Sequence, residues 1–331
     1  MIAATLYRRS AIENTHRAHV AVVDANGDLL HAFGDPHRMT LPRSAAKPAQ
    51  ALAIMQTGAL ERFAFDDADL ALMCGSHSSE PRHIDRARAM LAKADAHESD
   101  LRCGGHPPIS DAVYKDWIRR DFTPTPVCSN CSGKHAGMLA AARAMNAPLD
   151  GYHLSAHPLQ AHVKQTVAQA VDLPSDEVQW AIDGCNLPTP AFPLDRLARL
   201  YMKLAAAPDD SPLGRIHRAM TTYPELVSGE GRFCERLMRA FGGAVVGKTG
   251  ADASYAIGVK RAEGALGIAV KVEDGNLAVM HAIVAHVLHL LGIGTPEQRA
   301  ALDDFRHPPM RNTMGVETGR LDVTLTLTGQ R

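Results

Sequence analysis

Several features that would assign this sequence to a broad class are missing. Its 331 residues include 35 Lys or Arg and 36 Asp or Glu, giving a formal net charge of −1. This balance indicates neither a nucleic-acid partner nor a charged membrane surface. No apolar run is long enough to span a membrane, and residues 1–17 lack the apolar core and small-residue cleavage site of an export signal. We therefore expect a cytoplasmic protein, and the 46% hydrophobic and 21% charged residues are typical of soluble globular proteins.

The chain also lacks internal repeats, low-complexity segments and long linkers, so we expect a single domain over residues 1–331. Helical patterns fill its middle, and strand patterns cluster near its ends. These strand patterns cover residues 19–24, 29–33, 255–259, 266–272 and 321–327. The simplest architecture is an α+β fold. An antiparallel sheet would form from about residues 1–40 and 240–331, with a helical lobe over about 41–239.

The six cysteines do not form the pattern of a closed structural zinc site, because Cys128-x-x-Cys131 has no second Cys-x-x-Cys partner. In a cytoplasmic protein, thiols or metal ligands are expected rather than disulfides. By itself the Cys128/Cys131 pair fits either half of a zinc site or a redox pair. Cys131 and Cys185 would supply soft ligands of the kind zinc accepts.

Ser44-x-x-Lys47 stands at the start of an apolar helical pattern over residues 49–58. The spacing places both side chains on one face of a first helical turn, where Pro48 is tolerated. A lysine amine within hydrogen-bond reach can act as the base that activates a serine hydroxyl. Alone, the motif is more often an ordinary surface helix start.

A second element, Gly247-Lys248-Thr249-Gly250, follows about two hundred residues later. Ser-x-x-Lys and Lys-Thr-Gly occur in this order in serine β-lactamases and penicillin-binding proteins. The Ser-Asp-Asn element that accompanies them there is absent, and Cys128-Ser129-Asn130 is the nearest match. A β-lactamase is therefore one candidate function, weakened by the missing element and the missing export signal.

With these boxes in view, the chain resembles the L-asparaginase II family, the thermolabile, zinc-containing Rhizobium-type enzymes. The resemblance covers nearly the whole chain and begins at Glu13–Asp24. It continues through RSAAKP (43–48), CGSHSSEP (74–81), CSNCSGKHAGML (128–139), DGCNLPTPAFPL (183–194), GKTGAD (247–252) and GIAVKVEDGN (267–276). It implies a serine β-lactamase/glutaminase-like fold and a homodimer.

The resemblance further implies hydrolysis of L-asparagine to aspartate and ammonia. It places two catalytic pairs in the site, Ser44 with Lys47 and Ser76 with Lys248. It also implies a metal, usually zinc, bound by Cys131, Lys134 and Cys185, with Asp183 beside it. Lysine is an uncommon ligand because its amine must first lose a proton, so the residues alone would not propose Lys134.

Individual roles stay open between a chemical and a structural interpretation. Arg43 could bind a substrate carboxylate or simply begin the helix, and Asp183 could hold the substrate ammonium or cap a turn. His135 could bind the carboxylate, orient a ligand or pack in the core. Ser44 is the favoured nucleophile because a lysine is fixed three residues away, and Ser76 could relay protons from Lys248.

Three functions therefore compete. The first is an L-asparaginase that uses a Ser–Lys acyl-enzyme mechanism with zinc helping to anchor the substrate. The second is a related serine amidohydrolase, either a glutaminase or a β-lactamase-like enzyme; one methylene separates asparagine from glutamine and is worth about 1–3 kcal/mol. The third is a non-catalytic zinc-binding or thiol-binding module, which would have no need of two Ser–Lys pairs.

Overall fold

The computed structural model describes residues 1–329, which divide into two compact units. The first, called here the sheet unit, joins residues 1–45, 192–206 and 236–331. The second, the helical unit, joins residues 46–191 and 207–235. Each unit combines segments that are distant in the sequence, so neither could form from one contiguous stretch of the chain.

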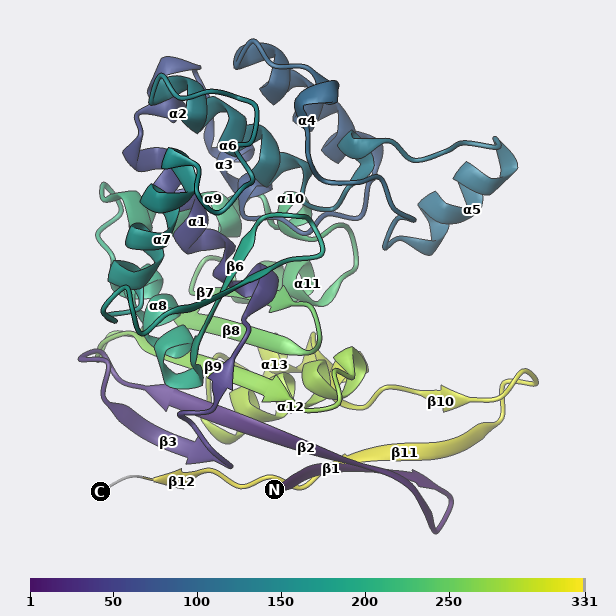
Figure 1. Ribbon diagram of the computed structural model, residues 1–331. Coiled ribbons are helices and arrows are strands. Elements are labelled where there is room, and N and C mark those ends of the chain that lie inside the picture. Colours follow the sequence, from purple (N-terminus) through teal and green to yellow (C-terminus); the bar gives the residue numbers. More distant parts are fainter. Residues whose placement is uncertain (330–331) are drawn as a thin grey trace. The chain divides into compact units, whose positions relative to one another are not determined.

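The sheet unit is built on one antiparallel sheet, to which both chain ends contribute (Figure 1). Strand β2 (Ala11–Val23) is its longest strand and pairs with β1 (Ile2–Arg8) through residues 11–17 and with β9 (Leu266–Val272) through residues 18–23. The main path runs β10 (Met310–Arg311), β11 (Glu317–Val323), β1, β2, β9, β8 (Ser254–Val259) and β7 (Val245–Gly250). Off this path, β3 (Leu29–Phe33) pairs with β2, and β12 (Thr328–Gly329) pairs with β3.

Two long helices of this unit pack on the sheet. Helix α8 (Leu194–Ala206) contacts β8, β9 and β2, and helix α12 (Leu277–Leu290) contacts β9, β11 and β1. Every residue of β8 and β9 is buried, so these strands are covered on both faces. The unit also contains α13 (Pro296–Ala300), α14 (Asp303–Arg306), the short strand β4 (Met39–Thr40) and most of α11 (Phe233–Phe241).

The expected antiparallel sheet from both chain ends and the helical middle are confirmed. The sequence pattern gave no sign of β1 or of the first half of β2. Residues 11–15 are all exposed and so carry no buried alternation that could reveal a strand. The strand expected over 321–327 is right only to Val323, where β11 ends.

The helical unit contains most of the helices and one hairpin. Its helices are α1 (Lys47–Gln56), α2 (Ala59–Arg62), α3 (Asp67–Met73), α4 (Pro81–Lys93), α5 (Asp111–Arg119), α6 (Ser132–Ala144), α7 (Pro158–Ala170), α9 (Pro212–Thr222) and α10 (Pro224–Val227). The hairpin joins β5 (Gln179–Ile182) to β6 (Pro188–Pro193). Among the residues described, no helix combines the length and apolar content needed to cross a membrane.

Helix α6 lies at the centre of this unit and contacts α1, α2, α3, α4 and α7. Residues 132–142 are all buried. Its small residues allow close approach: a Cβ on Gly133 would stand 2.7 Å from the Leu72 carbonyl oxygen, and one on Gly137 would stand 2.9 Å from Ile54. The first turn of α6 is therefore held directly against the C-terminal end of α3, where the segment 74–80 begins.

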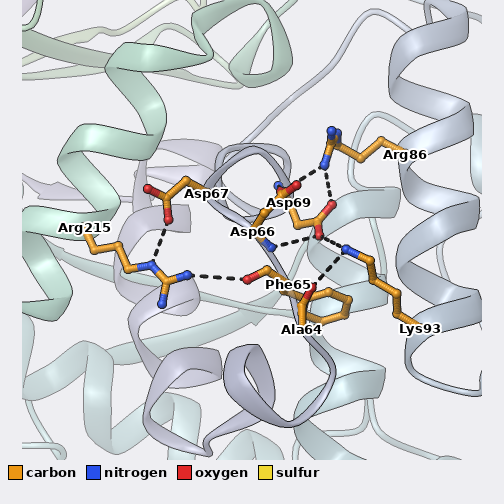
Figure 2. A network of polar contacts seen from close by, with 8 residues as sticks. All are labelled: Ala64, Phe65, Asp66, Asp67, Asp69, Arg86, Lys93 and Arg215. Atoms are coloured by element: carbon orange, nitrogen blue, oxygen red, sulfur yellow. Dashed lines mark hydrogen bonds and ion pairs between the residues drawn. The ribbon is translucent and has the colours of Figure 1, made fainter.

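A charged network joins the two helices on either side of segment 74–80 (Figure 2). Asp69 of α3 is 1% exposed and accepts hydrogen bonds from Arg86 at 2.6 Å and Lys93 at 2.7 Å, both on α4. It also closes a capping box with Asp66 at the start of α3. Because one buried carboxylate binds two cations of the neighbouring helix, the network fixes α4 relative to α3.

Asp69→Ala should lower the free energy of unfolding by roughly 2 kcal/mol, because it removes two ion pairs and half of a capping box. The cost stays below that of a fully buried pair, since the side chains of Arg86 and Lys93 are 31% and 35% exposed and can reach water. Urea unfolding measures the change. The matched control is Asp150→Ala, which breaks a 3.6 Å pair with Arg102 at a 94% exposed side chain and should cost little. Equal losses in the two variants would contradict the stabilising role of the network.

Candidate functional site

The predicted nucleophile Ser44 lies in a single 3₁₀ turn, Arg43–Ala46, that continues directly into α1. The turn is closed by the Ala45 N–H, which donates to the Pro42 carbonyl at 3.0 Å. Tyr201 of α8 donates to the Ala45 carbonyl at 2.9 Å. Ser44 is half-buried, and the preceding residue, Arg43, has a positive φ of 51°.

The Lys-Thr-Gly element forms the end of β7, and it lies against this same turn within the sheet unit. A Cβ on Gly250 would stand 2.0 Å from the Pro42 carbonyl oxygen, so the two backbones are in contact. Lys248 is 1% exposed, and its Nζ donates to the Thr249 carbonyl at 2.8 Å. Arg43 forms an ion pair with Asp252, just beyond the strand. The sheet unit thus brings Ser44, Arg43 and Lys248 to one region.

In the helical unit, Lys47 meets Ser76. Lys47 is the first residue of α1 and is 1% exposed; its Nζ donates to Ser76 Oγ at 3.2 Å and to the Gly75 carbonyl. Arg232 donates to the Ser76 carbonyl at 2.7 Å, and the Ser76 N–H donates to the Val227 carbonyl at 2.8 Å. A buried amine at hydrogen-bond distance from a serine hydroxyl is an arrangement suited to activating that hydroxyl. The sequence had paired Lys47 with Ser44 and Ser76 with Lys248, and it gave no sign of this contact.

The three predicted metal ligands also converge in the helical unit. Cys131 is the N-cap of α6, Lys134 lies in its first turn, and Cys185 lies in the turn between β5 and β6. Lys134 Nζ is 3.2 Å from Cys185 Sγ, and the two cysteine side chains are hydrogen-bonded to each other. All three residues are buried.

The electrostatics of this cluster shift the pKa values of the two cysteines in opposite directions. The hydrogen bond with Cys185, followed by burial, raises the pKa of Cys131 to about 12. The same hydrogen bond holds the pKa of Cys185 well below its ordinary value, and the nearby Lys134 adds to this effect. Burial alone would lower the pKa of Lys134, but Cys185, Cys131 and Asp183 outweigh it, and the pKa is raised. The Lys134 amine, which donates to Cys185 Sγ, and the hydrogen bond with Cys131 thus favour the thiolate form of Cys185, while the Cys131 thiol also lies 3.0 Å from Asn130 Oδ1.

Lys47 also acts electrostatically on this cluster, because the charge of its amine lowers the pKa values of both Cys131 and Cys185. Asp183 is half-buried in the β5–β6 turn, and its Oδ1 accepts from the Gly184 N–H at 2.7 Å. It acts on Lys134 through its charge. The predicted substrate-binding Asp183 and the three predicted ligands thus share one cluster with Lys47.

His135 follows Lys134 and is fully buried. The Tyr152 hydroxyl accepts from the Arg102 N–H at 3.0 Å and is hydrogen-bonded to His135 Nδ1 at 2.6 Å. Burial, together with the charge of Lys134, lowers the pKa of His135 to about 3. The ring is therefore neutral at ordinary pH and packs in the core beside Lys134.

Three neighbours of the site were not anticipated from the sequence. Arg232 donates to the Ser76 carbonyl, and Tyr152 is hydrogen-bonded to His135. Cys103 is the third, because the charges of Cys131 and Cys185 contribute to raising its pKa. Burial is the main reason that the pKa of Cys103 rises to about 12. Within residues 1–329, no group of three or more His, Cys, Asp or Glu side chains is arranged to hold a metal ion. A metal site formed by Cys131 and Cys185 would therefore need a further ligand of another kind, such as Lys134.

Comparison with known proteins agrees with the boxes in the sequence. The sequence model of the L-asparaginase II family matches residues 4–323. A search of curated proteins finds no match. Among solved structures, one similar chain is a provisionally named β-lactamase from Bacteroides dorei DSM 17855, with 11% sequence identity and a TM-score of 0.43 over 82% of this chain and 93% of that one. Because the family match extends over almost the whole length, the chain belongs to the L-asparaginase II family of hydrolases.

Proposed function

We propose that the protein hydrolyses the side-chain amide of L-asparagine to L-aspartate and ammonia through a serine acyl-enzyme. The observation that supports this proposal most directly is the buried contact of Lys47 Nζ with Ser76 Oγ at 3.2 Å. Lys47 itself lies three residues after Ser44, at the start of α1. Family membership supports the choice of an amide as substrate. We further propose that the protein acts as a homodimer, which light scattering in solution tests.

In the proposed reaction, Ser44 Oγ attacks the side-chain amide carbon, and Lys47 acts as the base that accepts the proton of the Ser44 hydroxyl. The tetrahedral intermediate then expels ammonia, which receives that proton through the Ser76 hydroxyl. Lys248 stabilises the negative charge that develops on the amide oxygen. Water then attacks the ester, loses a proton to Lys47, and releases aspartate while the proton returns to Ser44.

The cluster at Cys131, Lys134 and Cys185 fits zinc in its donor chemistry. It offers two cysteine sulfurs, one of them with a lowered pKa, and an amine 3.2 Å from that sulfur. When bound, zinc would supply a Lewis-acidic centre with an open position for the α-amino and α-carboxylate groups of the substrate. The proposed role of these three residues is thus to anchor substrate, while the serines carry out the acyl transfer.

The decisive experiment measures ammonia release from L-asparagine and L-glutamine by the wild type, Ser44→Ala and Ser76→Ala. We expect asparagine to be the better substrate and Ser44→Ala to remove the activity. Activity that survives in Ser44→Ala and disappears in Ser76→Ala would move the acylated residue to Ser76. Failure to release ammonia from either amide would overturn the proposed function. Hydrolysis of a chromogenic β-lactam would then favour the β-lactamase alternative, and tight zinc binding alone would favour a binding module.

Metal removal tests the anchoring role separately. After chelation, KM for asparagine should rise by a larger factor than kcat falls, because anchoring acts on the ground state and the transition state alike. Steady-state kinetics before and after dialysis against a chelator, with zinc added back, provide the measurement. A complete loss of kcat at unchanged KM would contradict the proposal.

A further inference from the structure

Segment 75–79 is entirely buried and is bound alternately on two sides. On one side, the Ser76 N–H donates to the Val227 carbonyl, and Ser78 Oγ donates to the Ser228 carbonyl at 2.8 Å. On the other side, the His77 N–H donates to the Asn130 carbonyl at 3.2 Å. Ser79 Oγ likewise donates to the Cys128 carbonyl at 2.8 Å. Ser76 is therefore followed directly by a residue, His77, whose backbone is hydrogen-bonded to the segment 128–132.

The ring of His77 extends this attachment into α6. His77 is 0% exposed, and its Nδ1 accepts from the Ser79 N–H at 3.1 Å. The proton of a neutral ring must then lie on Nε2, which is 2.9 Å from Ser132 Oγ and donates to it. Ser132 follows Cys131 and precedes Lys134 by two residues. The ring thus connects the residue after Ser76 to the first turn of the helix that carries two of the three candidate metal ligands.

A second imidazole holds this ring in place. His83 stacks on His77 with ring centroids 5.0 Å apart and an angle of 12° between planes. Its Nδ1 accepts from the Glu80 N–H at 3.1 Å, and its Nε2 is 2.8 Å from the Glu225 carbonyl, to which it donates. Both nitrogens of each ring are therefore occupied, and neither ring can rotate by 180° without losing two hydrogen bonds.

We propose that His77 is a positioning residue that couples Ser76 to the metal-binding turn of α6 through its Nε2–H···Oγ hydrogen bond with Ser132. This proposal rests on the proposed function for its activity readout but not for its other readouts. Outer-shell hydrogen bonds of this kind typically change activity or metal affinity by about 10- to 100-fold when removed. The hydrogen bond, rather than the bulk of the ring, is the part that matters.

Two variants of His77 separate these contributions. His77→Asn keeps a polar group where Nδ1 stands but cannot reach Ser132, whereas His77→Gln can place its amide nitrogen where Nε2 stands. We expect His77→Asn to lower kcat and zinc affinity by about 10- to 100-fold, and His77→Gln to recover most of the loss. Ser132→Ala should reproduce the effect of His77→Asn, and the double variant should be no worse than either single variant. His162→Asn is the matched control, because its ring binds the Ala53 carbonyl at 3.0 Å in the same unit; it should change neither quantity.

Zinc affinity is measured by competition with a chromogenic chelator, and kcat by ammonia release from asparagine. Equal defects in His77→Asn and His77→Gln would assign the effect to ring volume and overturn the proposal. A lowered melting temperature with kcat and zinc affinity unchanged would reduce His77 to a structural residue. Should the wild type release no ammonia, the proposed function fails, but the ¹⁵N resonances of His77 still decide. A neutral ring protonated at Nε2 supports the proposal, and one protonated at Nδ1 overturns it.

Discussion

Lys47→Met should reduce kcat/KM for asparagine by about 10³-fold, because it removes the proposed base while filling the same buried space. The melting temperature should fall only modestly, since the methionine fills the space of the lysine stem but removes the hydrogen bond to the Gly75 carbonyl. Lys47→Arg should be equally inactive, because a guanidinium stays protonated and cannot accept the serine proton.

Lys164→Met is the matched control. Lys164 of α7 also donates to a serine hydroxyl, that of Ser155, within the helical unit, but it lies outside the site. Its replacement should leave the kinetics unchanged. If Lys47→Met kept more than a tenth of the wild-type kcat, the base would lie elsewhere, and Lys248 would be the next residue to replace.

Acid should destabilise the metal-free protein strongly below pH 6.5. His77, His83 and His135 are buried and neutral, and burial is the main reason that each pKa is lowered. The unfolded chain takes up protons on these rings below about pH 6.5, whereas the folded protein does not, so stability is lost as the pH falls. With a folded pKa of about 3, His135 alone should cost about 2 kcal/mol between pH 6.5 and pH 5.

Urea unfolding at pH 7 and pH 5, with a chelator present, measures this loss. His135→Asn removes one titrating ring and should reduce the difference between the two pH values by about 2 kcal/mol, whatever its effect at pH 7. His307→Asn is the control, because the His307 side chain is exposed and its replacement should leave the difference unchanged. A stability independent of pH over this range would show that the three rings do not stay neutral.

The sequence predicted much of the fold because the decisive patterns were local. The strands over residues 255–259 and 266–272 were visible as apolar runs, and the helix over 277–291 was visible as a long apolar stretch. The first half of β2 was missed because it has no buried face. The antiparallel order of the sheet followed from the clustering of strand patterns at the two chain ends.

The site was predictable as a set of residues but not as a set of contacts. Ser44 and Lys47 were paired because they stand three residues apart, whereas the structure places the Lys47 amine on Ser76, 29 residues away. That contact depends on how α1 and α3 pack around α6, where Gly133 and Gly137 permit close approach. The sequence does not indicate which residues pack against either glycine. The convergence of Lys134 and Cys185 was likewise implied by family resemblance rather than by spacing.

The positive φ of Arg43 has a consequence for anyone who tries to improve this protein. A side chain other than glycine, asparagine or aspartate in this backbone region costs about 1 kcal/mol, and the residue lies immediately before Ser44. A screen for heat resistance should therefore enrich asparagine or glycine at position 43, whereas a screen for turnover should retain arginine. Stability and turnover are then selected in opposite directions at this position, provided that the proposed binding of the substrate carboxylate by the Arg43 guanidinium holds.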